Sequence, residues 1–301
     1  MTICRLLSES TIMLGTAQIE DPAIEAGLIL SWGLGKPSSY IYAHPDAELD
    51  SSDEELIMGL IVRRCKGEPF QYITGECEFL SLKFKVNPNV LIPRSDTEIL
   101  AEAAIYALGF DMPFAGGGMF RLDISGGNKK RVLDIGTGSG CLAVGIAHYA
   151  QNAAVDALDI SEESLSTARE NAGQNRVLHR IRFIRADFLN DDGFFDEPYD
   201  LIVSNPPYIP QYEEPYLAPS VKDFEPHQAL FAGNDGLAFF ERIAFLSGKM
   251  MKRNGIIVVE CGYNQADCVR NIFTRRDMET TVLKDLSGIS RVVAARKGLM
   301  K

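Results

Sequence analysis

The residues best suited to chemistry form a four-residue run, Asn205-Pro206-Pro207-Tyr208, directly after the apolar stretch 201–203. Each proline fixes its own backbone φ angle, so two in a row make the loop stiff before anything binds. The Asn205 carboxamide oxygen and the Pro206 carbonyl oxygen can each accept one N–H bond, which would fix the plane of an NH₂ group. This suits group transfer onto an amide or amine nitrogen. It predicts catalytic roles for Asn205, Pro206 and Tyr208 and substrate contacts for the whole run.

A glycine-rich turn precedes this run. It reads Gly136-Thr137-Gly138-Ser139-Gly140 and follows the apolar stretch 132–135. Glycines between a strand and a helix let the backbone approach a ligand closely, although the Gly-x-Gly-x-x-Gly spacing of dinucleotide-binding proteins is absent. Taken alone, a tight turn that packs a helix on a sheet would explain the glycines equally well. Together with the strand ends that follow, the turn predicts cofactor contacts for all five residues.

Acidic and aromatic side chains lie at the ends of the next two predicted strands. Asp159 could accept hydrogen bonds from a ribose diol, and Ser161 is the better candidate to cap the helix that follows. Asp187 could accept from an adenine amino group and Phe188 could stack on the ring, although core packing would explain Phe188 equally well. The strand ends thus describe an adenosine pocket without a pyrophosphate grip. S-adenosylmethionine, with S-adenosylhomocysteine as its product, fits this pocket better than a nicotinamide dinucleotide.

Two further residues complete the predicted chemistry, Asp134 and Tyr208. Asp134, just before the glycines, could orient the methionine end of the cofactor, or could be a buried acid that satisfies backbone N–H groups. Tyr208 could pack on the planar amide, and its ring face would favour a sulfonium cation. No base is needed before methyl transfer, because the proton can leave afterwards, so positioning and electrostatics would supply most of the catalysis.

Composition limits the possible partners. The 301 residues carry a net charge of −11, which weighs against a partner bound mainly through its phosphates, so we expect no direct nucleic-acid partner. No apolar run approaches the roughly 18 residues that cross a bilayer, and no export signal is evident, so we expect no membrane partner. Six scattered cysteines without a Cys-x-x-Cys pair and four histidines predict no metal site. These thiols fit the reducing cytosol, and we predict a cytoplasmic location.

Residues 1–75 predict a small helical bundle. Asp21 and Pro22 would be the N-cap and the first residue of one helix, with Gly33 and Gly35 just past its end. Ser52-Asp53-Glu54-Glu55 has the pattern of a capping box that opens another helix. This segment holds 11 acidic against 5 basic residues and is therefore acidic as a unit.

A hairpin over residues 76–92, with a turn at Asn87-Pro88-Asn89, would link this bundle to a second domain over residues 93–301. The capping pattern Ser95-Asp96-Thr97-Glu98 would open the first helix of that domain. The glycine-rich stretch 110–129 predicts a flexible surface loop or an insertion.

From residue 131 onward, short apolar stretches alternate with helical segments. This pattern is typical of an α/β fold whose mostly parallel sheet is covered by helices on both faces. The connection between the last two strands is short, so they should pair antiparallel. The seven predicted strands are 131–135, 154–159, 181–185, 199–204, 255–260, 279–284 and 290–296.

The motifs together resemble a known family. The Asn-Pro-Pro-Tyr run in the context of the glycine turn resembles class I methyltransferases that act on exocyclic or amide nitrogens. More specific phrases over nearly the whole chain resemble the peptide chain release factor glutamine N5-methyltransferases. These phrases are Gln71–Gly75, Leu91–Glu98, Phe224–Pro226 with Ala229-Leu230, Asp235–Leu237 and Glu260–Gln265.

The resemblance implies a Rossmann-like methyltransferase sheet and a substrate, the glutamine side chain in the Gly-Gly-Gln loop of a class 1 release factor. It implies that residues 1–75 contact the release factor, that residues 205–208 hold the glutamine and that Asn205 also contacts the cofactor. Arg94 would lie near the substrate, or would pair with Asp96 or Glu98. Glu260 would face the pocket, or would end its strand in solvent.

Two other functions compete with this one. A nucleic-acid methyltransferase would use the same loop on the exocyclic amine of a base, but an acidic helical domain is poorly suited to a polyanion. A binding module without catalysis would keep the pocket to sense a ligand, but the residues of the loop are all retained.

Overall fold

The computed structural model describes residues 1–113, 118–123 and 127–298. Two compact units divide the chain. One comprises Met1–Glu76 together with Ala218–Phe224, and the other comprises Cys77–Leu217 together with Glu225–Lys301. The first unit therefore includes a short segment from late in the sequence. No helix in the described part of the chain is long and apolar enough to cross a membrane.

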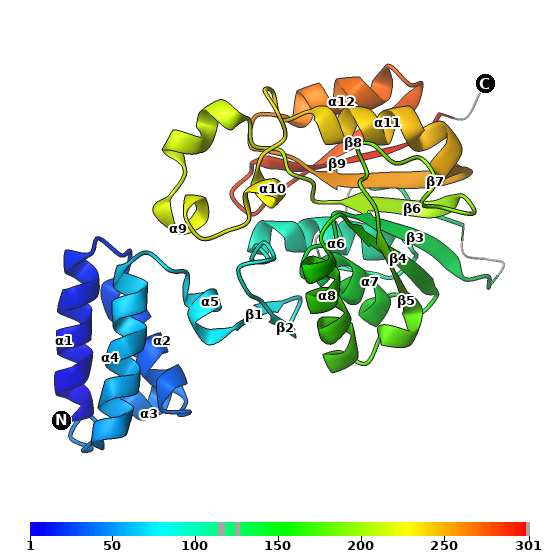
Figure 1. Cartoon of the computed structure of the whole chain (residues 1–301). Coiled ribbons are helices and arrows are strands. Elements are labelled where there is room, and N and C mark those ends of the chain that lie inside the picture. Colours follow the sequence, from blue (N-terminus) through cyan, green and yellow to red (C-terminus); the bar gives the residue numbers. More distant parts are fainter. Residues whose placement is uncertain (114–117, 124–126, 299–301) are drawn as a thin grey trace. The chain divides into compact units, whose positions relative to one another are not determined.

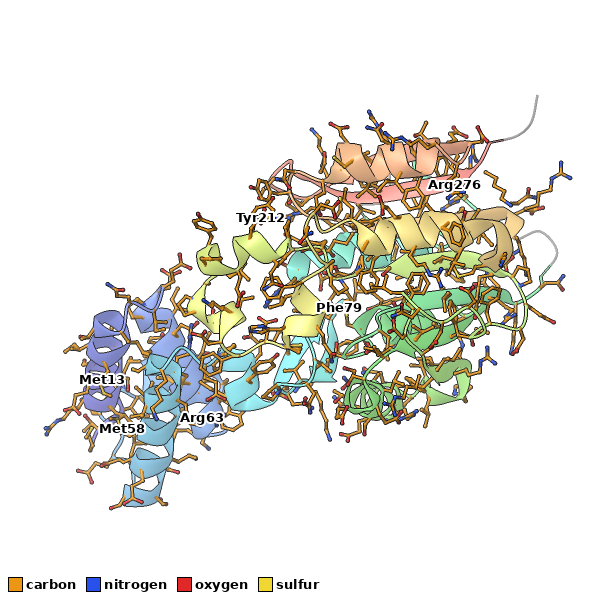
Figure 2. The ribbon with its side chains drawn as sticks, turned by 45° about the horizontal axis from the view of Figure 1, so that its top comes forward. Met13, Met58, Arg63, Phe79, Tyr212 and Arg276 are labelled. Atoms are coloured by element: carbon orange, nitrogen blue, oxygen red, sulfur yellow. The ribbon has the colours of Figure 1, made fainter. Side chains whose placement is uncertain are left out.

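The first unit is a small bundle of helices, as its sequence predicts. Its core includes Leu6, Leu30 and Ile57, all fully buried, and Met13 of α1 and Met58 of α4 pack against that core (Figure 2). The helices are α1 (Ile3–Thr16), α2 (Pro22–Gly33), α3 (Ser38–Ala43), α4 (Ser51–Cys65), α5 (Phe70–Thr74) and the late α9 (Pro219–Lys222).

These helices begin at or next to the predicted residue, but the predicted side chains do not cap them. Helix α2 does begin at Pro22, but Asp21 has a left-handed backbone and its side chain makes no capping bond. Helix α4 begins at Ser51 because the Asp50 carboxylate accepts from the Asp53 N–H at 2.8 Å. The box predicted at residues 52–55 is therefore wrong, since a carboxylate two residues earlier provides the cap.

The capping pattern predicted at residues 95–98 is also not formed. Helix α6 (Ser95–Ala107) begins where expected, but the residue at its N-cap is Arg94, which makes no side-chain cap. The Glu98 carboxylate instead accepts from the backbone N–H of Leu80 at 2.6 Å. Glu98 thus makes a tertiary hydrogen bond in place of the local capping bond that the sequence pattern predicts.

The predicted hairpin forms over a shorter range, as β1 (Glu76–Phe79) and β2 (Leu82–Lys85). The hairpin turn predicted at Asn87-Pro88-Asn89 is wrong, because those residues begin a separate turn after β2, in which the Val90 N–H bonds to the Asn87 carbonyl at 3.1 Å. The turn residues of the hairpin itself, Leu80 and Ser81, have φ angles of 50° and 59°, a region that glycine or asparagine usually supplies. Partners from two helices hold this turn, because the Tyr149 hydroxyl donates to the Leu80 carbonyl at 2.7 Å and Glu98 accepts from its N–H. Phe79 is buried in the core of the second unit (Figure 2).

The second unit is built on a seven-stranded sheet in the order β5-β4-β3-β6-β7-β9-β8. Neighbouring strands run parallel except that β9 is antiparallel to both β7 and β8, which confirms the predicted fold class. The strands are β3 (Lys130–Ile135), β4 (Ala153–Asp159), β5 (Ile181–Arg185), β6 (Tyr199–Ser204), β7 (Met251–Glu260), β8 (Met278–Lys284) and β9 (Ser290–Lys297).

Alternate residues of the central strands enter two separate cores. Val132 and Val203 belong to the core that includes residues of α6, α7 (Cys141–Tyr149) and α8 (Glu162–Gln174). Leu133 and Ile202 belong to the core that includes α11 (Ala238–Met250) and α12 (Ala266–Thr274). Figure 1 shows these two groups of helices on opposite faces of the sheet. Short helical turns, η1 (Leu178–Arg180), η2 (Gln211–Tyr216) and α10 (His227–Leu230), connect the larger elements.

The stretch predicted as a surface loop, 110–129, is partly core. Met119, Phe120 and Leu122 are each at most 8% exposed, and the Leu122 N–H bonds to the Ala107 carbonyl at 2.8 Å. Arg296 lies over the Phe120 ring, 4.3 Å from its centroid. The surface-loop prediction is wrong for these residues because apolar side chains follow the glycines, while 114–117 and 124–126 lie outside the described residues.

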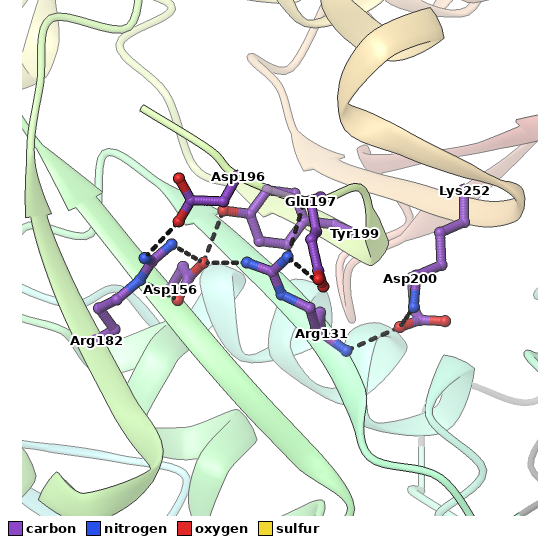
Figure 3. A network of polar contacts seen from close by, with 8 residues as sticks. All are labelled: Arg131, Asp156, Arg182, Asp196, Glu197, Tyr199, Asp200 and Lys252. Atoms are coloured by element: carbon purple, nitrogen blue, oxygen red, sulfur yellow. Dashed lines mark hydrogen bonds and ion pairs between the residues drawn. The ribbon is translucent and has the colours of Figure 1, made fainter. Parts of the chain in front are cut away.

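A polar network ties four strands together toward their amino ends (Figure 3). Asp156 of β4 accepts from Arg131 of β3 at 3.0 Å, from Arg182 of β5 at 2.8 Å and from the Tyr199 hydroxyl of β6 at 2.7 Å. A second Arg182 nitrogen donates to the other Asp156 oxygen at 3.0 Å. Both oxygens of this buried carboxylate are therefore paired.

Candidate functional site

At one point in the sheet, the connections that follow two neighbouring strands, β3 and β6, lead to opposite sides: β3 is followed by β4 on one side, and β6 by β7 on the other. From β3 the chain moves outward to β4 and β5, then returns to place β6 on the other side of β3. Ile135 and Ser204 are register partners on these neighbouring strands, so Gly136 and Asn205 follow side by side. Ligands of open α/β sheets bind at the carboxyl ends of the strands at such a switch point.

A cavity of about 290 Å³ lies at this point. Seven of the residues predicted from the sequence line it: Gly136, Gly138, Asp159, Asp187, Phe188, Asn205 and Pro207. The other predicted residues do not line it: Arg94, Asp134, Thr137, Ser139, Gly140, Pro206 and Tyr208. A wider depression of about 600 Å³, lined by residues such as Arg176 and Arg180, contains none of the predicted residues.

The glycine turn divides into an open part and a packed part. Gly136 and Gly138 have φ angles of 72° and 54°, and a Cβ atom added to either would meet no atom within 4 Å. A side chain at either position would therefore extend into free space at the cavity and would be strained. An added Cβ at Gly140 would lie 2.9 Å from the Ala168 Cβ, so this glycine lets α7 and α8 approach closely.

Asp134 lies fully buried beneath this turn. Its Oδ2 atom accepts from the Thr137 hydroxyl at 2.7 Å and from the Ala143 N–H at 3.1 Å, as the alternative reading of a buried acid expects. Its Oδ1 atom has no hydrogen-bond partner among the described residues. Burial raises the pKa of Asp134 to about 7, a change that the Thr137 and Ala143 hydrogen bonds oppose. Asp134 therefore supports the glycine turn from beneath and keeps one buried oxygen without a partner among the described residues.

Asp159 connects the end of β4 to the glycine turn. Its carboxylate accepts from the Gly138 N–H at 2.8 Å and from the Ser161 N–H at 3.0 Å. Burial raises its pKa, and these backbone hydrogen bonds lower it. Ser161 caps α8 through its own side chain, as the sequence predicts. Asp159 is thus held in place at the cavity wall.

The end of β5 supplies a turn and a ring. Asp187 closes the turn, because its carboxylate accepts from the Leu189 N–H at 3.0 Å and from the Asn190 side chain at 2.7 Å. Phe188 is 3% exposed, and its ring lies parallel to that of Phe239 with centroids 6.3 Å apart. Both rings line the cavity. Phe188 therefore belongs to the core and to the cavity wall at once.

The Asn-Pro-Pro-Tyr loop presents two free acceptors. The Asn205 Nδ2 atom donates to the Thr97 hydroxyl oxygen at 3.0 Å. Among the described residues, no donor bonds to the Asn205 Oδ1 atom or to the Pro206 carbonyl oxygen. Pro206 and Pro207 are buried, so the backbone between these acceptors is fixed by packing as well as by its rings.

Tyr208 is anchored from behind the loop. Its hydroxyl donates to Glu260 Oε1 at 3.3 Å, and its carbonyl accepts from the Gln265 side chain at 2.9 Å. Gly236 is needed beside it, because an added Cβ would lie 2.1 Å from the Tyr208 carbonyl oxygen. Burial raises the pKa of Tyr208, and the nearby Glu260 carboxylate raises it further.

Arg94 forms an ion pair that the sequence reading did not foresee. Its partner is Glu225, which is 3% exposed and also accepts from the Ile92 N–H at 3.4 Å. The alternative partners predicted for Arg94 are wrong. Asp96 pairs with Arg291 at 3.2 Å, and Glu98 bonds to the hairpin. Burial raises the Glu225 pKa, and Arg94 lowers it.

Glu260 ends β7 but is not a solvated strand terminus. It is 2% exposed, and its Oε2 atom has no hydrogen-bond partner among the described residues. Burial raises the pKa of Glu260 to about 7, against hydrogen bonds from Thr97 and Tyr208 and the charge of Arg291, which lower it. Glu260 stands behind the loop and does not line the cavity.

Three residues support the site through contacts that the sequence did not predict. Thr97 bonds to Asn205, Glu225 pairs with Arg94, and Gln265 holds Tyr208. Each lies inside one of the phrases that carry the family resemblance. Those phrases were a usable signal, because segments far apart in the sequence converge on one loop, but their pairing could not be read from the sequence.

Comparison with known proteins agrees with this geometry. A family model of the PrmC N-terminal domain matches residues 5–75, and a model of the methyltransferase small domain matches residues 119–218. A methyltransferase structure from Pyrococcus furiosus has a TM-score of 0.50 at 15% identity, covering 73% of this chain and 91% of that one. That likeness concerns the fold alone. The sheet and its switch-point cavity define a Rossmann-like methyltransferase.

The relatives identify the family. The chain is 36% identical over 300 residues to a release factor glutamine methyltransferase of Koribacter versatilis, covering 99% of each. It is 35% identical over 303 residues to a bifunctional methyltransferase of Rickettsia bellii, covering 97% of this chain and 54% of that protein. The chain thus spans about half the length of the bifunctional relatives that it matches. It belongs to the family of release factor glutamine methyltransferases, which confirms the resemblance predicted from its motifs.

Proposed function

We propose that this protein transfers a methyl group from S-adenosylmethionine to the side-chain amide nitrogen, N5, of the glutamine in the Gly-Gly-Gln loop of class 1 peptide chain release factors. The observation that carries this proposal is the pair of free acceptors, Asn205 Oδ1 and the Pro206 carbonyl, on a rigid loop at the edge of the switch-point cavity. Family membership supports the same activity.

The loop would act by holding the amide nitrogen. An amide lone pair is delocalised into its carbonyl, so the nitrogen is a weak nucleophile that must be oriented. Asn205 Oδ1 and the Pro206 carbonyl each accept one of its two N–H bonds, which fixes the amide plane and raises electron density on nitrogen. Because prolines and packing hold the backbone beforehand, little entropy is lost when the amide binds. The excess proton leaves after transfer, so no base is required first.

The cavity wall suits S-adenosylmethionine. Bound there, the cofactor supplies an electrophilic methyl group on a sulfonium sulfur. Asp159 is placed to accept from ribose hydroxyls, and Phe188 offers a ring face for adenine. Gly136 and Gly138 let the backbone of the turn approach the cofactor closely, and Asp134, buried beneath them, would orient the methionine end through the turn that it supports.

The helical unit would contact the release factor. Helix α2 carries Ile24, Leu28 and Trp32 at a spacing of four residues, and they are 60%, 40% and 39% exposed. One stripe of large apolar side chains thus remains in solvent, which supports a protein partner. The acidic charge of this unit disfavours nucleic acid, and the relatives do not favour the alternative of a base amine as substrate. The cytoplasmic location stays a prediction.

Radiolabelled transfer tests the proposed function. The protein is incubated with S-[methyl-³H]adenosylmethionine and purified class 1 release factor, or with RNA or DNA. We expect label in the release factor, and none when its Gly-Gly-Gln glutamine is replaced by glutamate, which has no NH₂ group. Label in nucleic acid alone would contradict the proposal.

A further inference from the structure

The wall of the switch-point cavity includes two segments that lie outside the sheet and the longer helices. Residues 89–91 follow the hairpin, and the second segment lies within residues 225–232, here called the strap, which contain the four-residue α10. Such short segments make few regular backbone hydrogen bonds of their own, so contacts with other parts of the molecule must position them. Those contacts therefore determine the width of the cavity.

The carboxyl end of the strap is held by the chain that follows the Asn-Pro-Pro-Tyr loop. The Ile209 N–H donates to the Leu230 carbonyl at 3.0 Å, and the Ala232 N–H donates to the Ile209 carbonyl at 3.1 Å. The other wall segment is held separately, because the Asn89 carbonyl accepts from the Ser164 hydroxyl of α8 at 3.1 Å. The amino end of the strap is the point at which the chain returns from the first unit to the second.

Glu225 ties this amino end to the other wall segment. Its side chain is 1% exposed and pairs with the Arg94 guanidinium. It also accepts from the Ile92 N–H at 3.4 Å. Glu225 and Ile92 each adjoin a residue of the cavity wall, Pro226 and Leu91 respectively. One buried carboxylate thus joins the two wall segments, and Arg94 supplies the opposite charge that a buried carboxylate requires.

We propose that the Arg94–Glu225 ion pair positions the strap at the cavity wall and thereby sets the affinity for the cofactor. The inference rests on the proposed function, because it requires S-adenosylmethionine in this cavity. Neither residue lines the cavity, so both are positioning residues. The inference replaces the substrate contact that the family resemblance implies for Arg94 with a role toward the cofactor.

The consequence for binding and turnover follows from the fraction of molecules in which the strap is in place. Apparent affinity falls in proportion to that fraction, because a cavity with a displaced wall does not bind the cofactor well. Once the cofactor is bound, the strap is back in place. Turnover with both substrates saturating should therefore change little.

The substitution Arg94→Met tests this role, because it removes the cation and leaves Glu225 buried without a partner. We expect calorimetry with S-adenosylhomocysteine to show an affinity about 10-fold lower, and kcat at saturating cofactor and release factor to stay within about twofold. Arg94→Lys keeps the charge and should recover most of the affinity. Arg169→Met is the matched control, since Arg169 is similarly exposed and pairs with Glu162 of the same helix.

A double-mutant cycle shows whether the two residues act together. Glu225→Gln should weaken binding of S-adenosylhomocysteine less than Arg94→Met does, because a neutral side chain needs no cation and can still accept from Ile92. In the Glu225→Gln background, Arg94→Met should have little further effect. Losses that add across the two substitutions would overturn the inference, because Arg94 would then act without Glu225.

Hydrogen exchange gives a readout that depends on neither binding nor turnover. In Arg94→Met without cofactor, amides of the strap should exchange several-fold faster than in the wild type, because the strap opens more often. Amides of β3 should be unchanged. A lower cofactor affinity with unchanged exchange in the strap would overturn the inference.

The outcomes distinguish the inference from the function on which it rests. A wild-type protein that does not bind S-adenosylhomocysteine overturns both, and one that binds it without methylating release factor overturns the proposed function alone. Wild-type cofactor affinity in Arg94→Met, with a raised KM for release factor, would overturn the inference and return Arg94 to the substrate. If Arg94→Met does not fold, as judged by thermal unfolding, Glu225→Gln decides, because wild-type affinity and exchange in that variant would contradict the role of the pair.

Discussion

Two buried carboxylates of the same sheet have opposite surroundings. Asp156, toward the amino ends of the strands, has both oxygens paired by two arginines and a tyrosine hydroxyl (Figure 3). Glu260, at the carboxyl end of β7, keeps one oxygen unpaired among the described residues, and burial raises its pKa to about 7. Asp134, at the carboxyl end of β3, shares both properties.

This difference in pairing distinguishes carboxylates that stabilise the fold from carboxylates that can take part in binding or catalysis. A buried carboxylate with all its partners joins strands and has nothing left to offer a ligand. A buried carboxylate that lacks a partner costs free energy, and such groups persist mainly where they orient or bind something. The amino ends of this sheet thus hold it together, and the carboxyl ends carry the proposed reaction.

The substitution Asn205→Ala, at the carboxyl ends of the strands, should have the largest of the predicted effects. We expect turnover of release factor to fall about 100- to 1,000-fold, as when a single preorganised hydrogen-bonding group is removed from an active site. Affinity for S-adenosylmethionine should stay within about fivefold, since most of the cavity wall is intact. Steady-state kinetics and calorimetry measure the two effects. Asn175→Ala is the matched control, because that side chain bonds only to backbone carbonyls away from the cavity. A variant with wild-type turnover would disprove the clamp.

Asp156→Ala should do the reverse. It leaves Arg131 and Arg182 without their shared partner, so we expect the free energy of unfolding to fall by about 3 kcal/mol. Turnover per folded molecule should not change. Urea unfolding and activity at low denaturant measure these quantities. The control is Asp196→Ala, which removes a surface partner of the same Arg182 and should cost at most about 1 kcal/mol. Equal losses in the two variants would contradict the structural role of the network.

The sequence predicted the strands and the Asn205 loop much better than it predicted the contacts between residues that are far apart in the chain. The strands were found because residues such as Val132 and Ile202 are buried on both faces of a parallel sheet, which produces short apolar runs. The Asn205 loop was found because its proline pair has few other uses. The Arg94–Glu225 pair was missed because 131 residues separate its members, and the Asp156 network because its four residues lie on separate strands.

The raised pKa of Glu260 also predicts that the stability of the protein depends on pH. The folded-state pKa of Glu260, about 7, lies above its ordinary value of 4.5, so folding favours the protonated acid. Its contribution to stability is fully present below pH 4.5 and is lost as the pH rises to about 7. Relative to Glu260→Gln, the wild type should lose roughly 3 kcal/mol over this window.

Urea unfolding at each pH measures that difference. Asp96, Arg291 and Tyr208 face Glu260 and are present in both proteins, so the comparison changes residue 260 alone. Glu170→Gln, which removes an exposed carboxylate of α8, corrects for the general loss of one negative charge. A stability difference between wild type and Glu260→Gln that stays constant from pH 4.5 to 7 would mean that Glu260 titrates like an exposed acid.

The smallest expected effect concerns Asp159, whose surroundings lie between the two extremes. Its oxygens accept from the Gly138 and Ser161 N–H groups, yet it also lines the cavity. Asp159→Ala should therefore weaken S-adenosylmethionine binding by about 10-fold, the loss of one or two net hydrogen bonds to a ribose. Asp159→Asn keeps the size and one acceptor and should lose less. Calorimetry with S-adenosylhomocysteine gives the affinity of each variant without turnover. An unchanged affinity in Asp159→Ala would place this carboxylate with Asp156, as a group that only holds the fold, and would move the ribose contact elsewhere on the cavity wall.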